Sequence, residues 1–481
     1  MTRFLDASNL VVRAGGLLLD IPHLRFEQGR THCLIGKSGS GKSLLAWAVA
    51  GLRASDLDID GEVTLDGAKP PGPLWQDEIF LLPQEPAIAL DPTMPVGKQI
   101  AEILRWRRAT NCAWPDVEAL AREVGLTRAD LAKLPAELSG GMQQRAMIAM
   151  ALAVRSSFVI ADEPTKGLDT PNKARVIALF QQIQASGRGL IVITHDLGVA
   201  RALADTISVV DDGRIVEHGP AKSVLRDPQS SAARTLIESE PAQWSFGART
   251  APSAASPVVD LSRVAFGYSA THPLLEIDAL DIGRGEIVGL FGPSGVGKST
   301  LGDLCLRLRA PRSGTVRWHG APAGRQIVKR HRAKFQKLFQ NPITAFPPNL
   351  SLKTVFKELT PAARQAAPAL AGLLSRLGLR DDLLDRRPDQ LSGGELQRFA
   401  IARTLVGQPD FIVCDEPSSR LDMSVQRQAI DLITDYVKDR AAAALLISHD
   451  IEILRKRADR IYELTDRGRL LSLDSEADGP S

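Results

Sequence analysis

Short, mostly apolar runs recur along the chain, and glycine-rich or charged residues follow them at once. Thr31–Ile35 and Ile287–Phe291 each lead into a glycine-rich loop, and a further apolar segment follows each loop, at 44–50 and 301–306. Apolar runs of about five residues are typical of strands buried in a sheet that helices cover on both faces. The pattern therefore predicts an α/β fold in which strand, glycine-rich loop and helix follow one another twice.

Two more pairs of apolar runs end in polar side chains. Residues 158–161 and 411–414 are each followed by an Asp-Glu pair, and two later apolar runs end at a histidine. Since α/β sheets bind ligands at the carboxyl ends of their strands, we expect these polar residues to lie near the glycine-rich loops. The residues at these strand ends are Asp162, Glu163, His195, Asp415, Glu416 and His449.

These motifs form two series, one in each half of the chain. The loop at 36–43 (GKSGSGKS) returns at 292–299 (GPSGVGKS), an offset of 256 residues (292 − 36). The segment LSGGMQQR at 138–145 returns as LSGGELQR at 391–398, an offset of 253 residues (391 − 138). An offset that changes so little over a whole domain predicts two copies of one fold.

The composition of the chain marks where one copy ends. Residues 241–257 are rich in Ala, Ser and Pro and have neither a helical nor a strand period, which predicts a flexible linker. Residues 472–481 are small and acidic, which predicts a disordered tail. The predicted domains are therefore residues 1–240 and 258–471.

Composition and charge argue against several classes of protein. The 481 residues are 44% hydrophobic, and 59 Lys and Arg against 56 Asp and Glu give a net charge of +3. No stretch of about 18 apolar residues occurs, so we expect no membrane span. The small net charge offers little attraction to nucleic acid. The cysteines show no metal-ligand spacing, so we expect reduced thiols in a cytosolic protein.

The two glycine-rich loops have the order strand, GxxxxGKS and helix that phosphate binding requires. Glycines let backbone N–H groups surround phosphates, and the helix N-terminus adds a positive dipole. We expect Lys42 and Lys298 to reach the β- and γ-phosphates of ATP, and Ser43 and Ser299 to bind Mg²⁺. The loop residues predicted to bind ATP are Gly36, Lys37, Ser38, Gly39, Ser40, Gly41, Lys42, Ser43, Gly292, Pro293, Ser294, Gly295, Val296, Gly297, Lys298 and Ser299.

The Asp-Glu pairs supply further groups that ATP hydrolysis needs. The first acid, Asp162 or Asp415, can hold Mg²⁺ through its waters, and the second can act as general base for the attacking water. A histidine after a strand is usually structural, but histidines at equivalent positions in both halves favour a contact with the γ-phosphate. The predicted catalytic residues are Glu163, Glu416, His195 and His449.

The segment LSGG-x-x-x-R, placed between a phosphate-binding loop and an Asp-Glu pair, resembles the signature of the ATP-binding cassette (ABC) ATPases. The resemblance covers about residues 4–235 and 258–470. It implies two tandem ABC-type nucleotide-binding domains, each with a P-loop NTPase core, an antiparallel β subdomain and a helical signature subdomain. It also implies Q-loop glutamines that sense Mg²⁺ and the membrane partner, Gln84 and Gln340, and D-loop acids, Asp169 and Asp422. The Mg²⁺ ligands expected in total are Ser43, Ser299, Asp162, Asp415, Gln84 and Gln340.

Cassettes of this family pair head to tail, which implies that each ATP lies between the P-loop of one copy and the LSGG segment of the other. The signature residues expected there are Ser139, Gly140, Gly141, Ser392, Gly393 and Gly394. Both sites keep the second acid and the histidine, so we expect both to hydrolyse ATP. Tyr268 could stack on adenine in one site. Its counterpart by spacing is Val12, which leaves open whether adenine is stacked in the other site.

The segment that begins at Gln84, QEPAIALDP followed by VGKQIAE, is similar to a pattern found in oligopeptide, dipeptide and nickel importer ATPases. This resemblance implies an ATPase subunit of a bacterial importer for peptides, opines, or nickel and metal chelates, at the cytoplasmic face of the inner membrane. The partners it implies are two transmembrane permease subunits and a substrate-binding protein, and no nucleic acid.

Other ABC proteins also carry two cassettes. The ABC proteins that act on ribosomes have signatures similar to LSGGE-K-x-R and a long charged linker. In this chain the two signatures end in QQR and LQR, and the predicted linker is short. Fused sugar-importer ATPases usually lose catalytic residues in one half, and this chain keeps them in both. The alternatives that remain are the ribosomal protein and an energy-coupling-type vitamin or metal importer ATPase.

Overall fold

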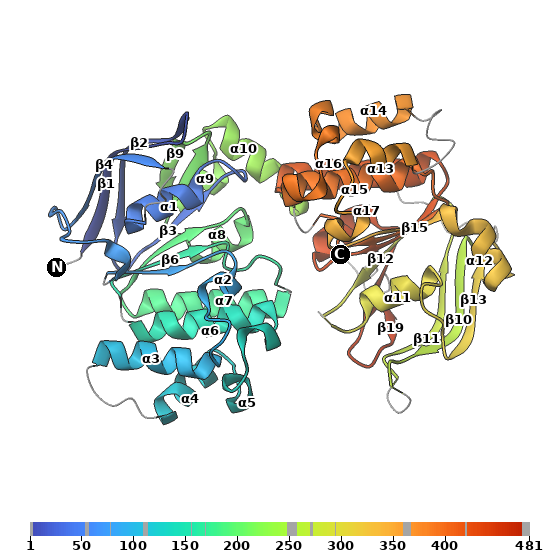
Figure 1. Cartoon of the computed structure of the whole chain (residues 1–481), viewed down its shortest axis with the longest axis horizontal. Helices are drawn as coiled ribbons and strands as arrows, with labels where there is room; N and C mark the ends of the chain where they lie inside the picture. Colours follow the sequence, from blue (N-terminus) through green and yellow to red (C-terminus); the bar gives the residue numbers. More distant parts are fainter. Residues whose placement is uncertain are drawn as a thin grey trace, which may run out of the picture. The chain divides into compact units, whose positions relative to one another are not determined.

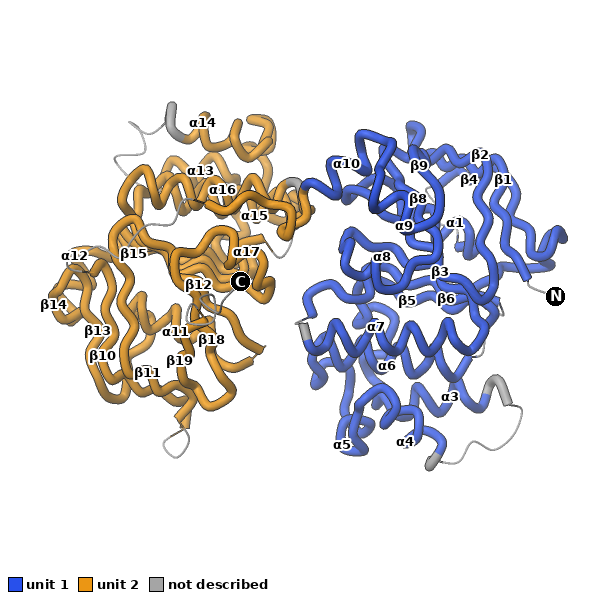
Figure 2. Tube along the Cα trace, turned by 180° about the vertical axis from the view of Figure 1, so that it is seen from behind, with its two compact units in different colours: residues 1–238 blue, residues 239–481 orange. Residues whose placement is uncertain are grey.

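The computed structural model describes residues 3–52, 57–76, 78–108, 114–154, 156–168, 170–247, 257–269, 273–293, 295–358, 367–418 and 421–473. The chain divides into two compact units, Met1–Glu238 and Ser239–Ser481, which Figure 2 colours separately. Each unit has its own β-sheets and its own hydrophobic core (Figure 1).

The first unit contains a mainly parallel sheet and an antiparallel sheet. Its described strands are β1 (Phe4–Arg13), β2 (Leu17–Glu27), β3 (Thr31–Ile35), β4 (Asp58–Leu65), β5 (Ile79–Leu82), β6 (Phe158–Asp162), β7 (Gly189–Ile193), β8 (Thr206–Asp211) and β9 (Arg214–Pro220). The main sheet has the order β5-β6-β7-β3-β8-β9, with only β9 antiparallel, and the second sheet has the order β2-β1-β4. Its described helices are α1 (Lys42–Ala50), α2 (Pro86–Ala89), α3 (Val96–Arg108), α4 (Trp114–Glu123), α5 (Arg128–Leu131), α6 (Gly140–Val154), α7 (Thr170–Ala185), α8 (Leu197–Leu203), α9 (Ala221–Arg226) and α10 (Ser231–Glu238).

The second unit repeats this plan. Its described strands are β10 (Val259–Phe266), β11 (Leu275–Ile282), β12 (Ile287–Phe291), β13 (Ser313–Trp318), β14 (Ala321–Pro322), β15 (Phe335–Leu338), β16 (Phe411–Asp415), β17 (Ala443–Ile447), β18 (Arg460–Leu464) and β19 (Leu470–Ser472). Its described helices are α11 (Lys298–Cys305), α12 (Arg325–His331), α13 (Leu352–Glu358), α14 (Ala367–Arg376), α15 (Gly393–Val406), α16 (Met423–Asp439) and α17 (Ile451–Arg457). Among the helices that the structure describes, none is both long and apolar enough to span a membrane.

The central strands are buried on both faces, as their apolar sequences predict. Every residue of β3, β6 and β7 is buried, and so is every residue of β16 and β17. Leu34 of β3 and Ile160 of β6 pack with Val49 of α1 in one core cluster. Burying a side chain of this kind contributes about 1.5–3 kcal/mol. The polar residues that follow these strands are therefore held by a strongly stabilised framework.

The matching strand order places the predicted site residues alike in both units. The order β15-β16-β17-β12-β18-β19 repeats β5-β6-β7-β3-β8-β9. Because β3, β6 and β7 are parallel, Gly36, Asp162 and His195 lie at one edge of the sheet, and the second unit repeats this at β12, β16 and β17. The predicted α/β fold is confirmed, with a sheet-based core, an antiparallel β subdomain and helices (α3–α6 and α13–α15) around each LSGG segment.

The described part of the predicted linker is packed instead of flexible. Residues 239–247 belong to the second unit, where Trp244 is 1% exposed and its indole N–H donates to Ser239 O at 2.9 Å. Gly247 N donates to Lys456 O at 2.9 Å, and Arg457 donates to Ser245 O at 2.7 Å. The prediction of a linker from 241 was wrong for 241–247, because a tryptophan can anchor a segment that has no local period. Residues 248–256 lie outside the described residues.

The end of the second unit also extends past its predicted boundary. Ser472 closes β19, which pairs with β18, and Leu473 N donates to Ile461 O at 2.9 Å. The tail predicted from residue 472 therefore begins with one residue of the sheet and a second that is hydrogen-bonded to it. Residues 474–481 lie outside the described residues.

Candidate nucleotide-binding sites

Glycine is required where each loop leaves its strand. Gly36 has φ +156° and Gly292 has φ +145°, in the range that favours glycine. A Cβ at Gly36 would lie 2.1 Å from Val210 O, and one at Gly292 would lie 2.5 Å from Leu464 O. Side chains at these two positions would collide with the neighbouring strand, so the backbone can turn here only without them.

The lysine of each loop points back into the loop that it follows. Lys42 is 7% exposed, and its ammonium donates to Gly36 O at 2.9 Å and to Lys37 O at 2.6 Å. Lys298 donates to Gly292 O and Pro293 O, both at 2.7 Å. Each ammonium thus lies against the loop at the N-terminus of a helix, where a phosphate would meet both the charge and N–H donors.

The serine after each lysine lies close to the first acid of the Asp-Glu pair. Ser299 Oγ donates to Asp415 Oδ1 at 3.0 Å. In the first unit, burial raises the pKa of Asp162, and the Ser43 hydroxyl and Lys42 act against this rise. Asp162 Oδ1 is buried without a hydrogen-bond partner among the described residues.

These hydroxyl and carboxylate oxygens fit a magnesium ion that also binds phosphate. Mg²⁺ in such sites takes one or two protein oxygens and completes its shell with water and phosphate. Within the described residues no cluster of three or more His, Cys, Asp or Glu could hold a metal by itself. A buried carboxylate oxygen without a partner, as at Asp162, is a position that an incoming cation would satisfy.

The second acids stand in a strained backbone conformation. Glu163 and Glu416 both have φ +48°, which non-glycine residues seldom adopt. Their amides donate to the last residues of the neighbouring strands, Glu163 N to Ile193 O at 2.8 Å and Glu416 N to Ile447 O at 3.0 Å. Identical strain at the same position of both units is typical of a functional turn that the surrounding sheet holds in place.

Each second acid is paired with the histidine of the next strand. His195 Nδ1 lies 2.7 Å from Glu163 Oε1, and His449 Nδ1 lies 3.7 Å from Glu416 Oε2. Burial lowers the pKa of His195, but the hydrogen bond and charge of Glu163 outweigh it, so the pKa lies above its usual value. The neighbouring carboxylate of Glu416 raises the pKa of His449, against burial, which lowers it. The second acid and the histidine, which were predicted separately, are therefore in contact in both units.

The structure places the two Q-loop glutamines at equivalent positions after β5 and β15. Gln340 Nε2 donates to Glu416 Oε2 at 2.9 Å. Gln84 is exposed on the loop that follows β5. A glutamine that touches the second acid from a surface loop can transmit a movement of that loop to the carboxylate.

The signature segments begin helices whose first turns are exposed. Ser392 caps α15 and exchanges hydrogen bonds with Glu395, whose backbone N donates to Ser392 Oγ at 3.2 Å. Ser139 precedes α6, and Met142 N donates to Ser139 Oγ at 3.3 Å. Gly140, Gly141, Gly393 and Gly394 form the first turns of these helices. Open helix N-termini of this kind offer N–H donors to an anion.

Two of the predicted residues lie outside the described residues, Asp169 and Ser294. Asp422 occupies the N-cap position of α16. Burial lowers the pKa of Arg398, against the charges of Glu395 and Asp422, which raise it. The predicted D-loop acid of the second unit is thus next to the signature helix of its own unit.

The aromatic asymmetry predicted from spacing has a structural counterpart. Tyr268 is 66% exposed, and its hydroxyl lies 3.1 Å from Thr300 Oγ1, at the start of α11. Val12 is fully buried in β1 and presents no surface to a base. By strand register Val12 corresponds to Phe266, because Val12 pairs with Leu19 as Phe266 pairs with Leu275, and these two leucines lie beside Gly41 and Gly297 respectively. The position two residues later, which Tyr268 fills in the second unit, is therefore held by Ala14 in the first unit.

One charged residue near the second site was not predicted. Lys337 of β15 is 10% exposed, and its ammonium lies 2.8 Å from Asp303 Oδ1 and 3.3 Å from Asp415 Oδ2. Leu81 holds the equivalent place in β5, because Leu81 pairs with Ile160 as Lys337 pairs with Val413. A lysine in the strand just before Gln340, where the first half has the apolar run IFLL, was the signal that could have revealed it.

Comparison with known proteins identifies the family. The ABC transporter family matches residues 19–166 and 275–419. A peptidoglycan transport ATP-binding protein of Agrobacterium fabrum is 34% identical over 490 residues, which span 94% of this chain and 89% of that protein. A glutathione import ATP-binding protein of Salmonella choleraesuis is 31% identical over 503 residues, spanning 91% and 80%. The structure of an archaeal ribosome recycling factor, aABCE1, in complex with the ribosomal stalk protein aP1, aligns with a TM-score of 0.70 at 21% identity, over 97% of this chain and 90% of that one.

At 21% identity, the alignment with the aABCE1 structure shows a shared fold and nothing further. Each of the two matched regions contains a phosphate-binding loop, an LSGG segment and an Asp-Glu pair. We refer to Met1–Glu238 as the first cassette and to Ser239–Ser481 as the second cassette. The chain belongs to the ABC transporter family and is an ATPase with two ATP-binding cassettes.

Proposed function

We propose that this chain is the ATP-hydrolysing subunit of a bacterial importer whose cargo contains peptide bonds. Support comes from two relatives, at 34% and 31% identity over nine-tenths of the chain or more, named for peptidoglycan transport and glutathione import. Peptidoglycan and glutathione both contain peptide bonds. Neither name mentions nickel or an opine, so the proposal is confined to peptide-type cargo.

The observation that carries the proposal is a complete set of hydrolytic side chains in each cassette. Each cassette has a loop lysine, a serine beside a buried aspartate, and a second acid in contact with a histidine. A cassette that only binds ATP would not need the strained second acid and its paired histidine. This duplication supports hydrolysis at both sites.

In the proposed mechanism the loop N–H groups, with Lys42 or Lys298, hold the β- and γ-phosphates. Ser43 with Asp162, and Ser299 with Asp415, would hold Mg²⁺, which when bound neutralises phosphate charge. Glu163 or Glu416 accepts a proton from the attacking water. The paired histidine, whose pKa the glutamate raises, donates a hydrogen bond towards the γ-phosphate.

We further propose that each ATP is enclosed by both cassettes. The exposed helix N-terminus at Ser392 would complete the site of Lys42, and that at Ser139 would complete the site of Lys298. Asp169 and Asp422 would contact the opposite cassette beside these segments. Joining both cassettes in one chain raises the local concentration of each for the other.

The proposed partners are two transmembrane permease subunits and a substrate-binding protein. The permeases would hold the chain at the cytoplasmic face of the inner membrane, docked on residues 84–100 and 340–355. The contact between Gln340 and Glu416 gives this surface a direct route to a catalytic carboxylate. No role for nucleic acid is proposed.

Turnover of the two sites can be separated by substitution. We expect Glu163→Gln and Glu416→Gln each to lower ATP hydrolysis by about 10²-fold or more, because a general base is worth about 10²–10⁴-fold. The measurement is phosphate release by the purified chain, with Glu452→Gln as a control at an exposed acid of the second cassette. An unchanged rate in either site variant would show that its site does not hydrolyse ATP.

Transport is tested in cells of the source organism that lack this chain. We expect uptake of a radiolabelled tripeptide to be lost and to return with the wild-type chain but not with the Glu163→Gln Glu416→Gln double variant. Unchanged uptake, together with co-sedimentation of the double variant with ribosomes, would replace the importer by the ribosomal alternative.

A further inference from the structure

The positive charge of the second cassette is concentrated in one continuous stretch of its sequence. Residues 304–337 contain ten Lys or Arg and no Asp or Glu. The equivalent stretch of the first cassette, residues 48–81, contains two Lys or Arg and seven Asp or Glu. The small net charge of +3 therefore conceals two stretches of opposite sign at equivalent places of the two cassettes.

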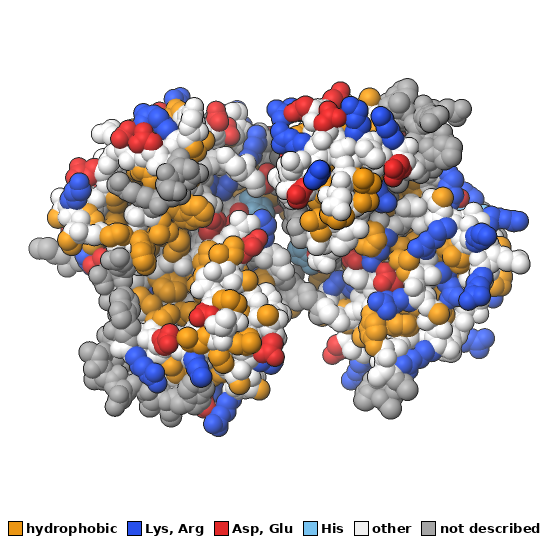
Figure 3. Space-filling model, viewed as in Figure 1, with side chains coloured by type: hydrophobic (Ala, Val, Ile, Leu, Met, Phe, Trp, Pro, Cys, Tyr) orange, Lys and Arg blue, Asp and Glu red, His pale blue; other side chains and the backbone are white. Residues whose placement is uncertain are grey.

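Helix α12 presents the exposed part of this positive charge. Arg325, Lys329 and Arg330 are exposed, whereas Ile327 and Val328 pack against the core of the second cassette. Within the part of the chain that the structure describes, none of these three cations forms an ion pair. Figure 3 shows Lys and Arg side chains gathered over this part of the second cassette. The helix thus exposes a cationic face whose charge the fold itself does not neutralise.

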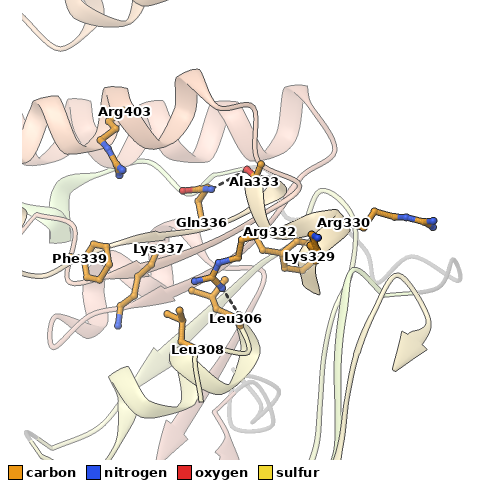
Figure 4. A pocket seen from close by; sticks show the side chains of 11 residues that line it. Leu306, Leu308, Lys329, Arg330, Arg332, Ala333, Gln336, Lys337, Phe339 and Arg403 are labelled. Atoms are coloured by element: carbon orange, nitrogen blue, oxygen red, sulfur yellow. Dashed lines mark hydrogen bonds between the residues drawn. The ribbon is translucent and has the colours of Figure 1, made fainter. Parts of the chain in front are cut away.

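The C-terminal end of α12 lies beside the surface proposed to dock the permeases. Lys329 and Arg330 are among the residues that line a cavity of about 450 Å³, and so is Phe339, directly before Gln340. Figure 4 shows the side chain of Arg330 extending away from Lys337. Because the proposed docking residues 340–355 would face the permeases, the cations of α12 would face the membrane surface on the same side.

The side chains of this stretch favour a lipid surface over a nucleic acid. Proteins that bind single-stranded RNA use exposed aromatic side chains on which bases stack. Trp318 and Phe335, the Trp and Phe of this stretch, stack on each other and are only 1% and 2% exposed. Exposed cations alone suit the headgroups of an anionic leaflet, which attract Lys and Arg through charge.

We propose that α12 binds the anionic lipids of the cytoplasmic leaflet, so that the second cassette contacts the membrane surface directly as well as through the permeases. This inference rests on the proposed importer function for the side of the chain that faces the membrane, and it adds a lipid surface to the partners. Because Ile327 and Val328 pack inward, the contact is electrostatic and is weakened by salt.

The first cassette does not share this contact. Asp58, Asp60 and Glu62 are exposed on β4, within the equivalent stretch of the first cassette. An anionic leaflet repels carboxylates at the distances at which it attracts Lys and Arg. The two cassettes therefore differ in their affinity for the membrane surface, although their nucleotide sites carry the same catalytic residues.

The test measures co-sedimentation of the purified full-length chain with lipid vesicles. Vesicles of phosphatidylcholine alone are compared with vesicles of equal parts phosphatidylcholine and phosphatidylglycerol, which are anionic. We expect the chain to sediment with the anionic vesicles only. Raising the salt from about 0.1 M to about 1 M shortens the Debye length from about 10 Å to about 3 Å and should release it. Equal binding to both kinds of vesicle, or binding that salt does not weaken, would overturn the proposal.

A triple substitution on α12 localises the contact. We expect Arg325→Gln Lys329→Gln Arg330→Gln to weaken binding to anionic vesicles by about 10²-fold, because each Lys or Arg near an anionic leaflet adds to the attraction. Vesicle binding equal to that of the wild-type chain would show that α12 is not the lipid surface.

A matched control separates the face of α12 from the overall charge of the chain. Arg376→Gln Arg380→Gln Arg455→Gln removes the same charge at three exposed arginines elsewhere in the second cassette. We expect this control variant to bind anionic vesicles as the wild-type chain does. An equal loss of binding in the control and in the α12 variant would mean that net charge, and not α12, holds the chain on the vesicles.

A charge-conserving variant guards against misfolding. Arg325→Lys Arg330→Lys keeps both positive charges, so we expect it to bind anionic vesicles as the wild-type chain does. Loss of binding in this variant would contradict a contact that depends on charge alone.

Two further outcomes separate this proposal from its alternatives. Binding of polyuridylic acid in a fluorescence anisotropy assay, lost in the α12 triple variant and without binding to anionic vesicles, would replace the lipid by RNA. The vesicles contain no permease, so a chain that fails to bind them but still supports peptide uptake would refute the lipid contact and leave the importer function intact. Failure of the importer function would appear in the uptake assay.

Discussion

Lys337 distinguishes the two ATP sites through a single side chain. Its ammonium contacts Asp415, which also accepts a hydrogen bond from Ser299, whereas the first site has Leu81 in the equivalent place. A lysine so close to an expected Mg²⁺ ligand competes with a cation for the carboxylate. The two sites are therefore alike in their catalytic residues and unlike in their electrostatics.

We expect Lys337→Leu to tighten divalent-cation binding at the second site by roughly tenfold, because it removes a cation whose ammonium lies 3.3 Å from Asp415 Oδ2. The measurement is Mn²⁺ binding to the ADP-bound chain by electron paramagnetic resonance. Leu81→Lys should weaken the first site, and Lys353→Leu, at an exposed lysine, should change neither. Equal Mn²⁺ affinity in Lys337→Leu and the wild-type chain would contradict this competition.

The pair of Glu163 and His195 predicts a pH dependence of stability. Because Glu163 raises the folded pKa of His195 above its unfolded value of about 6.5, protonation favours the folded state. The stabilisation by the pair is fully present well below the unfolded pKa and is lost as the pH rises through the folded pKa.

We expect Glu163→Gln to lower the pKa of His195 in an NMR titration, and to reduce the free energy of unfolding more at pH 6 than at pH 8. The resonance of His32, whose pKa burial lowers to about 3, is an internal control and should not move between these pH values. An unshifted His195 titration would mean that the 2.7 Å contact does not set its protonation.

Among the elements, the segment 239–247 belongs to the second cassette, and Trp244 is its buried side chain. Trp244 packs with the core of that cassette, and the guanidinium of Arg457, on α17, lies 4.9 Å from the centre of its ring. Phe246, two residues later, is 68% exposed and lies under Lys456. Trp244 therefore anchors the segment, whereas Phe246 lies on the surface.

We expect Trp244→Ala to destabilise the second cassette by about 3–5 kcal/mol, the usual cost of removing a large buried aromatic side chain. Phe246→Ala should cost about 1 kcal/mol or less, because it removes only an exposed cation–π contact. Hydrogen exchange of the β12 and β16 amides reports the stability of this cassette in the full chain. Similar losses in both variants would show that Trp244 is not the anchor.

The elements that carry chemistry were predictable because each has a local signal. Buried strands appear in the sequence as short apolar runs. The loops at 36–43 and 292–299 need glycine at fixed positions for steric reasons. The packing of 241–247 had no such signal, since Ala, Ser and Pro around one Trp are compatible with a linker and with an anchored strap. Only contacts with α17, more than 200 residues later, distinguish them.

At the scale of the whole molecule, head-to-tail pairing can be tested, because each LSGG segment should affect only the ATP site of the other cassette. In the Glu163→Gln Glu416→Gln double variant, we expect Ser392→Arg to abolish photolabelling by 8-azido-ATP of the loop at residues 36–43 in the first cassette. Ser139→Arg should abolish labelling of the second cassette loop, because each signature would close the site of the other cassette. Labelling is mapped by mass spectrometry of the loop peptides. Loss of labelling in the cassette that carries the substitution would contradict head-to-tail pairing.

The sequence by itself determined the duplication, the α/β fold and the residue types of both sites, because each depends on short motifs and local periods. It did not determine the contacts that set their chemistry. The strained φ of Glu163 and Glu416 depends on hydrogen bonds to neighbouring strands. The difference between Lys337 and Leu81 likewise acquires meaning only when β15 brings that lysine beside Asp415 and Asp303. Such contacts join residues far apart in the chain, so only the tertiary structure decides which charges meet.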